Sequence, residues 1–267
     1  MAIKQAKVFT ITSVKGGVGK TVTTLNLAAI FSIRKVKTVI LDLDLYTGGI
    51  DLLLKLNPKR NLFDIIDDLN NNQFSSIEDY ICSYNEYIDA IVSPKDPRDA
   101  NKINAKYLSL ILSKLKMKYD VVLIDTNHFM NDINLITFDS SDQIIYIVDN
   151  DLVGCKNMRS MVSIYSDMEK ANYMIIYNES TNKQKGYFTK YDIKNMIGTS
   201  IDYTIPSSFY IKNIERYFLD GKIPLLDKKT RKYYKMGTQN LEKLSNALYQ
   251  IDEKEEIKKE KFRRIKK

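Results

Sequence analysis

Lysines, glycines and a threonine near the start of the chain are combined in a pattern that could bind phosphate groups. The stretch Lys15–Thr21 reads KGGVGKT and lies between an apolar segment and an amphipathic one, which predicts a loop between a strand and a helix. Three glycines let the backbone N–H groups turn inward, where they and the positive end of the next helix would hold a polyphosphate. Lys20 would reach the β- and γ-phosphates, and the Thr21 hydroxyl would bind Mg²⁺. These residue types predict a nucleotide site.

The loop differs from the general pattern G-x-x-x-x-G-K-[ST], because Val14 stands where the first glycine is expected. With its additional lysine, Lys15, it resembles the deviant Walker A loop of the ParA/MinD family of ATPases. The resemblance implies ATP and Mg²⁺ as ligands. It also implies a homodimer that encloses ATP between its subunits, with Lys15 reaching the partner's phosphates. The implied nucleotide contacts along the loop are Gly16, Gly17, Val18, Gly19, Lys20, Thr21 and Val22.

Three aspartates at the ends of apolar runs are the candidate acids of this site. The run Thr38–Asp44 ends in Asp42 and Asp44, and the run Tyr119–Asp125 ends in Asp125. Ligands gather at the carboxyl ends of parallel strands, so we expect these acids beside the loop; solvated acids at strand ends are the alternative. Asp125 has the position at which P-loop enzymes hold Mg²⁺. By the resemblance, Asp44 orients the attacking water and Asp42 orders the magnesium shell. The predicted metal set is Thr21, Asp42 and Asp125, and the predicted catalytic set is Lys15, Lys20 and Asp44.

Three more polar or turn positions are candidates. Asn178 ends an apolar run where the family carries an asparagine that binds adenine, although a strand-end asparagine is also a favoured turn residue. Pro206 starts the loop that wraps the base in the family. His128, the single histidine, could touch the γ-phosphate or the attacking water, or could be an exposed loop residue. We favour the second interpretation of His128, because hydrolysis in the family needs no histidine base. The loop 127–132 lacks the prolines usual in the family, and we expect slow hydrolysis.

The elements that position these residues alternate along the chain. Seven to eight aliphatic runs alternate with amphipathic segments, which predicts an α/β fold with a single doubly wound, mainly parallel sheet and helices on both faces. We expect one ATPase domain over residues 1–251 and a charged tail over 252–267. Expected strands cover 7–12, 38–44, 87–94, 119–125, 143–148, 172–178 and 201–205. Expected helices cover 20–34, 101–117, 155–170, 187–197, 209–219 and 234–251, with two short ones within 58–84.

Composition limits the cellular setting and the partners. No apolar run approaches the roughly 20 residues needed to span a bilayer, and the first residues lack the apolar segment of a signal peptide, so we expect a cytoplasmic protein. Cys82 and Cys155 lack metal-ligand spacing and are expected to be buried. The net charge of +8 favours an anionic partner, either nonspecific DNA or a membrane surface. The tail could lie on a membrane through Ile257, Phe262 and Ile265, but a solvated helical extension is the interpretation we favour.

Two segments bear on the cellular role of the protein. The run 41–54 and the stretch 90–98 resemble the CpaE/TadZ branch of the family, which positions pilus or secretion machinery; MinD and the flagellar-number ATPases share much of the first segment. The resemblance implies an ATP-dependent dimeric switch ATPase that positions a pilus or secretion assembly at a cell site, at a pole or at the inner face of the membrane. One alternative is a ParA-like partition ATPase that binds nonspecific DNA in its ATP state, although no Pro-Gln pair follows Asp44. Another is an ATP-binding scaffold with little hydrolysis.

Overall fold

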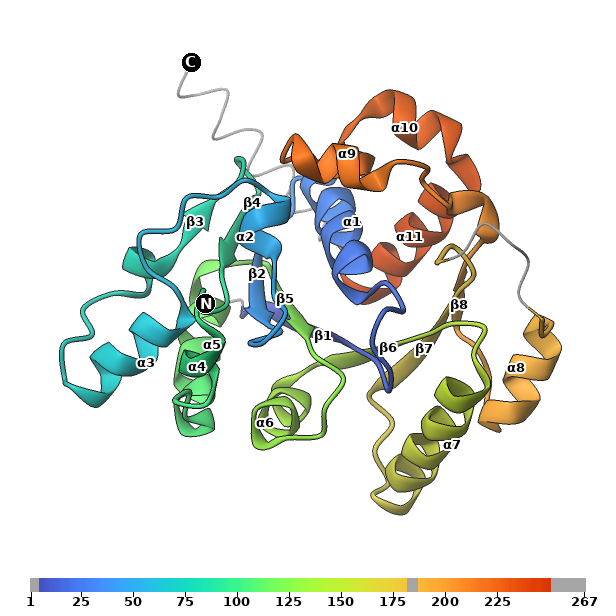
Figure 1. Cartoon of the computed structure of the whole chain (residues 1–267), viewed down its shortest axis with the longest axis horizontal. Coiled ribbons are helices and arrows are strands. Elements are labelled where there is room, and N and C mark those ends of the chain that lie inside the picture. Colours follow the sequence, from blue (N-terminus) through green and yellow to red (C-terminus); the bar gives the residue numbers. More distant parts are fainter. Residues whose placement is uncertain (1–4, 182–186, 251–267) are drawn as a thin grey trace.

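A single eight-stranded sheet runs through the computed structural model, which describes residues 5–181 and 187–250; the expected tail over 252–267 lies outside them (Figure 1). The strand order is β3-β4-β2-β5-β1-β6-β7-β8, and every neighbouring pair is parallel except β3 and β4. The strands are β1 (Lys7–Thr12), β2 (Thr38–Leu43), β3 (Cys82–Ser83), β4 (Ile88–Ile91), β5 (Val121–Thr126), β6 (Gln143–Val148), β7 (Tyr173–Asn178) and β8 (Tyr203–Ile205). This topology confirms the predicted fold class.

Helices cover both faces of the sheet (Figure 1). They are α1 (Lys20–Ile33), α2 (Ile50–Leu53), α3 (Leu62–Asn70), α4 (Pro97–Ala100), α5 (Leu108–Lys118), α6 (Asp132–Ser140), α7 (Leu152–Asp167), α8 (Lys190–Ile197), α9 (Ile214–Leu219), α10 (Lys228–Tyr233) and α11 (Lys235–Leu248). Within the described residues, four 3₁₀ turns span Ile77–Tyr80, Ala105–Tyr107, Ser207–Phe209 and Pro224–Leu226. None of the described helices combines the length and apolar character required to cross a membrane.

The alternation of side chains along each strand produces separate cores on the two faces. In β5, Val121 and Leu123 pack into one apolar cluster with α1 and α11, whereas Val122 and Ile124 pack into another with α3 and α5. A third cluster joins β6 and β7 to α7 and α8. The central strands are therefore apolar on both faces, as expected for a buried parallel sheet. Polar residues occur at their carboxyl ends.

The structure differs from the predicted elements where local turns interrupt an apolar pattern. The helix expected over 101–117 begins only at Leu108, because the Asn104 side chain caps a 3₁₀ turn ahead of it. The helix expected from 209 begins at Ile214, after Asn213 in a left-handed conformation. The strand β3 and the helices α2, α4, α6 and α10 were not predicted. Cys155 is buried as predicted, but Cys82 is half-buried because it lies on the two-residue edge strand β3.

One glycine in α11 provides a test of packing at the carboxyl end of the sheet. A Cβ on Gly237 would lie within 3.0 Å of three atoms of the buried Phe209 side chain. Gly237→Ala should therefore lower the free energy of unfolding by roughly 1 to 2 kcal/mol, because the overpacking exceeds the gain of about 1 kcal/mol in helix propensity. Urea denaturation measures this effect, with the exposed Gln239→Ala on the same helix as the control. An unchanged or higher stability of Gly237→Ala would contradict the prediction.

Candidate nucleotide site

The loop between β1 and α1 has the backbone conformation of an anion site. Gly17 and Gly19 have φ angles of 78° and 91°, which only glycine adopts without strain. No side chain caps the amino end of α1, which begins directly after Gly19. The first N–H groups of α1 are thus free to bind a ligand, and the helix dipole favours a negatively charged one.

The first residues of α1, Lys20 and Thr21, lie close to Asp125 at the end of β5. The Thr21 hydroxyl donates a hydrogen bond to Asp125 Oδ2 at 2.6 Å, and Thr24 Oγ1 donates to Asp125 Oδ1 at 3.1 Å. Lys20 is only 8% exposed; burial lowers the pKa of its ammonium group, and the charges of Asp125 and Asp44 oppose that change. Asp125 lies at the carboxyl end of β5, opposite Ile11 of β1 and Asp42 of β2. The parallel register therefore brings together the acid and the loop that the sequence predicted.

Asp42 is fully buried, and both of its carboxylate oxygens accept hydrogen bonds from neighbouring residues. Oδ1 accepts a hydrogen bond from the Asp44 N–H at 3.1 Å, and Oδ2 accepts from Ser93 Oγ at 3.0 Å and from the Ile50 N–H at 3.5 Å. These bonds close the loop between β2 and α2. The predicted part of Asp42 in a magnesium shell remains a prediction, but the contacts give it a further role in fixing the loop that carries Asp44.

Asp44 lies half-buried at the start of this loop. Its carboxylate accepts hydrogen bonds from Thr47, from Oγ1 at 2.9 Å and from the N–H at 3.3 Å. Each carboxylate oxygen keeps a further lone pair that could accept a hydrogen bond from a water molecule. The predicted catalytic role of Asp44 is compatible with its place near Lys20, where its charge opposes the lowering of the Lys20 pKa by burial.

The donor set fits Mg²⁺. A threonine hydroxyl and a carboxylate provide hard oxygen ligands, and Mg²⁺ in nucleotide sites takes one or two such groups together with phosphate oxygens and water. The described parts of the chain hold no group of three or more His, Cys, Asp or Glu side chains that could bind a metal ion. When bound, the ion would neutralise phosphate charge, and Thr21 and Asp125 would hold it.

Burial of these carboxyl groups predicts a pH dependence of stability. Burial, together with the charge of Asp125, raises the pKa of Asp42 to about 8, and burial also raises that of Asp125. The folded state thus keeps a proton that the unfolded state releases near pH 4, so the stability of the nucleotide-free protein should fall from about pH 4 to pH 8. Urea denaturation across this range should show a flatter pH profile for Asp42→Asn than for wild type or for the exposed Asp167→Asn. Equal slopes in all three proteins would refute this assignment.

Lys15 forms ion pairs within its own chain. Its ammonium group lies 3.2 Å from Asp151 Oδ2 and 3.7 Å from Asp149 Oδ2, and its side chain is 40% exposed. Asp149 follows β6, and Asp151 caps α7 through the Gly154 N–H. Lys15, which we expected to reach a partner subunit, is therefore paired with two acids of its own chain, Asp149 and Asp151, that the sequence analysis did not identify.

Asn178 and Pro206 lie on the other side of the loop. Asn178 pairs with Ile205 across β7 and β8, so it is next to Pro206. Its Nδ2 donates to the Val18 carbonyl at 2.9 Å, which ties β7 to the phosphate loop. Asn178 thus lies beside Val18 and Gly19, with Pro206 directly after its pairing partner Ile205, and the contact of both residues with adenine remains a prediction.

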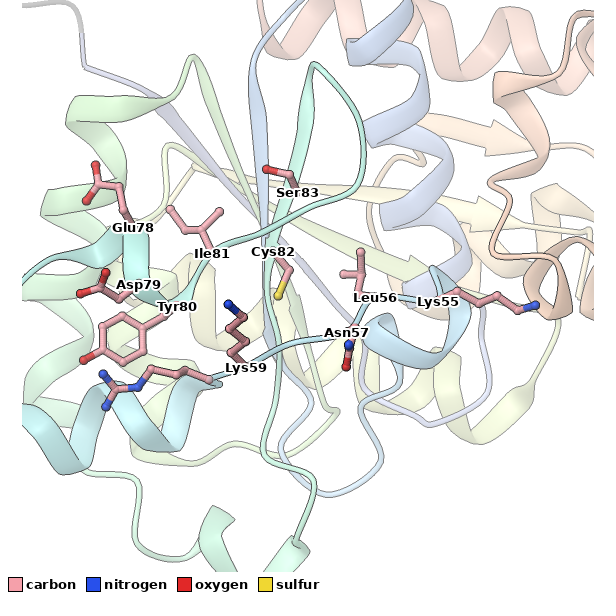
Figure 2. A pocket seen from close by; sticks show the side chains of 11 residues that line it. Lys55, Leu56, Asn57, Lys59, Glu78, Asp79, Tyr80, Ile81, Cys82 and Ser83 are labelled. Atoms are coloured by element: carbon pink, nitrogen blue, oxygen red, sulfur yellow. The ribbon is translucent and has the colours of Figure 1, made fainter.

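A separate cavity of about 700 Å³ lies far from this site, at the β3 edge of the sheet (Figure 2). Lys59 and Cys82 point into the space between the segments that line it. Two of its charged groups are paired: Arg60 with Asp68, and Glu78 with Lys118 at 2.6 Å. Three strands, β4, β2 and β5, separate β3 from β1, so this cavity is not part of the nucleotide site.

Comparison with known proteins decides the family. A family model described as an AAA domain matches residues 6–176, well over half of the chain. The chain is a member of the ParA/MinD family of P-loop ATPases. MinD of Synechocystis is 32% identical over 120 residues, which are 45% of this chain and 44% of that protein. This chain therefore spans under half the length of that relative.

Solved structures of the ParA/MinD family share the fold. A ParA family ATPase from Chlorobium tepidum has a TM-score of 0.74 at 18% identity, covering 91% of this chain and 98% of that one. MinD from Pyrococcus horikoshii, in complex with Mg-ADP, has a TM-score of 0.72 at 20% identity, covering 92% and 96%. These likenesses extend the shared fold beyond the segment that the family model matches.

The sequence analysis did not identify some residues of this ParA/MinD-type site. Thr24, Ser93, Asp149 and Asp151 contact the predicted site residues directly. The position of Asp149 after an apolar strand was a usable signal, because the same rule had pointed to Asp42, Asp44 and Asp125. Ser93 and Thr24 carry no such signal, since serine and threonine are common in turns and helices.

Proposed function

We propose that this ParA/MinD-family protein is an ATPase that closes into a homodimer around Mg-ATP and uses this switch to position a macromolecular assembly in the cell. The observation that carries the proposal is the arrangement of Lys20, Thr21 and Asp125 at an uncapped helix amino end, with Lys15 beside them. Lys20 and Lys15 would neutralise phosphate charge, and Asp44 would orient water; catalysis of this kind depends on positioning and electrostatics. A pilus or secretion assembly is the cargo favoured by the resemblance of residues 41–54 and 90–98.

Exposed apolar side chains around the loop support the dimer. β1 lies between β5 and β6, so the segments that follow these two strands flank the phosphate loop. They carry Phe129 and Met130, each 53% exposed, and Leu152 and Val153, 58% and 60% exposed. Exposed apolar side chains in the segments on both sides of the loop favour an interface with another protein surface. A second copy placed here would also bring its own Lys15 to the site.

Light scattering after size-exclusion chromatography tests the dimer. Wild type should be monomeric with Mg-ADP and dimeric with Mg-ATP. Lys15→Ala should bind nucleotide but stay monomeric, and Asp44→Ala should form a dimer that persists because hydrolysis is lost. A parallel phosphate-release assay separates the switch from a scaffold: equal turnover of wild type and Asp44→Ala would favour the scaffold. A wild-type protein that binds no nucleotide would refute the proposal as a whole.

A second candidate, a partition ATPase that binds DNA, is favoured by one basic region. Residues 210–236 hold eight Lys or Arg against three acids, a net charge of +5. Lys212, Arg216 and Lys222 line a cavity of about 360 Å³ at α9, and Lys228, Lys229 and Lys232 are exposed on α10. A hydrogen bond of 3.0 Å between Tyr217 and Thr230 links the two helices. Such a region could neutralise several phosphates of a duplex.

Fluorescence anisotropy of a labelled random duplex distinguishes the two candidates. Salt-sensitive binding that needs Mg-ATP, and that is lost when Lys228, Lys229 and Lys232 are replaced by glutamate, would support partition. The control replaces Lys95, Lys156 and Lys194, which are exposed elsewhere, by glutamate. Absence of binding in both nucleotide states would leave a protein assembly as the cargo.

A further inference from the structure

His128 lies against the phosphate loop. The position of a Cβ on Gly16 would be 3.7 Å from both Cε1 and Nδ1 of the imidazole, a normal van der Waals separation. Gly16 directly follows Lys15, so the ring lies over the amino-terminal half of the loop. Although the sequence favoured a loop histidine without a function, its tertiary position is at the proposed nucleotide site.

A network of buried asparagines holds the backbone on both sides of His128. Asn127 Oδ1 accepts hydrogen bonds from the Phe129 N–H at 3.0 Å and from Asn134 Nδ2 at 2.9 Å. Asn134 Nδ2 also donates to the Phe129 carbonyl at 2.6 Å. Asn127 is 4% exposed and Asn134 is completely buried. The Phe129 ring lies 4.3 Å from the imidazole, centroid to centroid, and adds a further contact. This segment takes the place of the prolines usual in the family and fixes where the histidine projects.

The polar atoms of the ring are available to a ligand. His128 is exposed, and its ring nitrogens make no hydrogen bond to another residue within 5–181 or 187–250. An imidazole N–H is a hydrogen-bond donor in either tautomer. A donor without a partner beside a loop built to hold phosphates is suited to bind a phosphate oxygen.

The position of the ring in the sheet indicates which phosphate it addresses. His128 follows β5, whereas Asn178 at the opposite side of the loop follows β7, with β1 and β6 between them. Asn178 marks the end of the site expected for the base. Asp125, at the His128 end, has the position from which P-loop enzymes hold the metal ion that bridges the β- and γ-phosphates. The ring is therefore on the side of the terminal phosphate.

We propose that His128 is a nucleotide-binding residue that donates a hydrogen bond to the terminal phosphate of ATP and so makes the site distinguish ATP from ADP. This inference rests on the proposed function, because it assumes that the loop holds a nucleotide. It adds to the proposed nucleotide contacts a residue outside the loop and its acids.

Binding of fluorescent AMPPNP and fluorescent ADP, each with Mg²⁺, tests the inference. His128→Ala should weaken binding of the ATP analogue about tenfold, the loss expected for one hydrogen bond to a charged group, and change ADP binding less than twofold. His128→Gln keeps a donor and should stay within about threefold of wild type. Leu135→Ala, exposed on α6 nearby, is the control and should bind both nucleotides as wild type does. Equal weakening of both nucleotides by His128→Ala, or no change in either, would overturn the inference.

The single histidine allows a direct second measurement. In the untagged protein the imidazole Cε1–H gives one NMR signal, because the chain contains no other histidine. Mg-AMPPNP should shift this signal and Mg-ADP should leave it close to its free position. A signal that responds equally to both nucleotides, or to neither although both bind, would overturn the assignment of His128 alone. If wild type binds neither nucleotide, the proposed function fails and the inference fails with it.

Discussion

Lys20→Ala is expected to lower kcat/KM for ATP at least 100-fold. Lys20 is buried near Asp125 and Asp44, and its positive charge would offset the negative charge of the β- and γ-phosphates beside these acids. Without it, the phosphates would meet uncompensated carboxylates. Loss of one such electrostatic contact typically costs a factor of about 100 to 1,000 in rate, or about 3 to 4 kcal/mol.

A phosphate-release assay and a nucleotide-binding titration would measure this loss. The control is Lys7→Ala, an exposed lysine at the start of β1, away from the phosphate loop, which should hydrolyse ATP within twofold of wild type. Circular dichroism and thermal melting establish that the Lys20→Ala protein is folded. Turnover by Lys20→Ala within tenfold of wild type would show that this lysine does not serve the reaction, and the assignment of the site would have to change.

Gly48→Ala is expected to have the second largest effect, through the loop that carries Asp44. A Cβ on Gly48 would lie within 3.0 Å of Ser93 Oγ, the Asp44 carbonyl oxygen and Asp42 Oδ2. These atoms form the hydrogen bonds that close the loop, and the Gly48 N–H itself donates to the Asp44 carbonyl at 2.6 Å. The loop must therefore move. We expect a loss of about 2 kcal/mol in the free energy of unfolding and at least a tenfold fall in kcat.

Gly49→Ala is the matched control for this prediction. A Cβ on Gly49 meets no atom within 4 Å, although the residue adjoins Gly48 in the same loop. Urea denaturation and ATP turnover should therefore leave Gly49→Ala close to wild type and separate it from Gly48→Ala. Similar behaviour of the two variants would mean that the loop adapts to a side chain at position 48, and that Asp44 does not depend on its closure.

The sequence predicted the central elements because their patterns are local. The aliphatic runs that became β1, β2, β5, β6 and β7 are buried on both faces, and such runs stand out from amphipathic helices without knowledge of contacts. Prediction failed at short elements. The edge strand β3 has two residues and exists only through its antiparallel pairing with β4, and α5 begins late because of a turn that Asn104 stabilises.

The sequence by itself determined the chemistry of the loop and the acids at the strand ends. The spacing of residues along the loop identifies Gly17, Gly19, Lys20 and Thr21 as its phosphate-binding positions. Neighbouring parallel strands end at the same edge of the sheet, and this brings Asp42 and Asp125 together however the helices pack. The tertiary structure alone decided that Ser93 binds Asp42, that Asp149 and Asp151 hold Lys15, and that His128 lies against Gly16. Each of these contacts joins residues that are far apart along the chain. Their proximity in space depends on strand order and register, which no local pattern of side chains encodes.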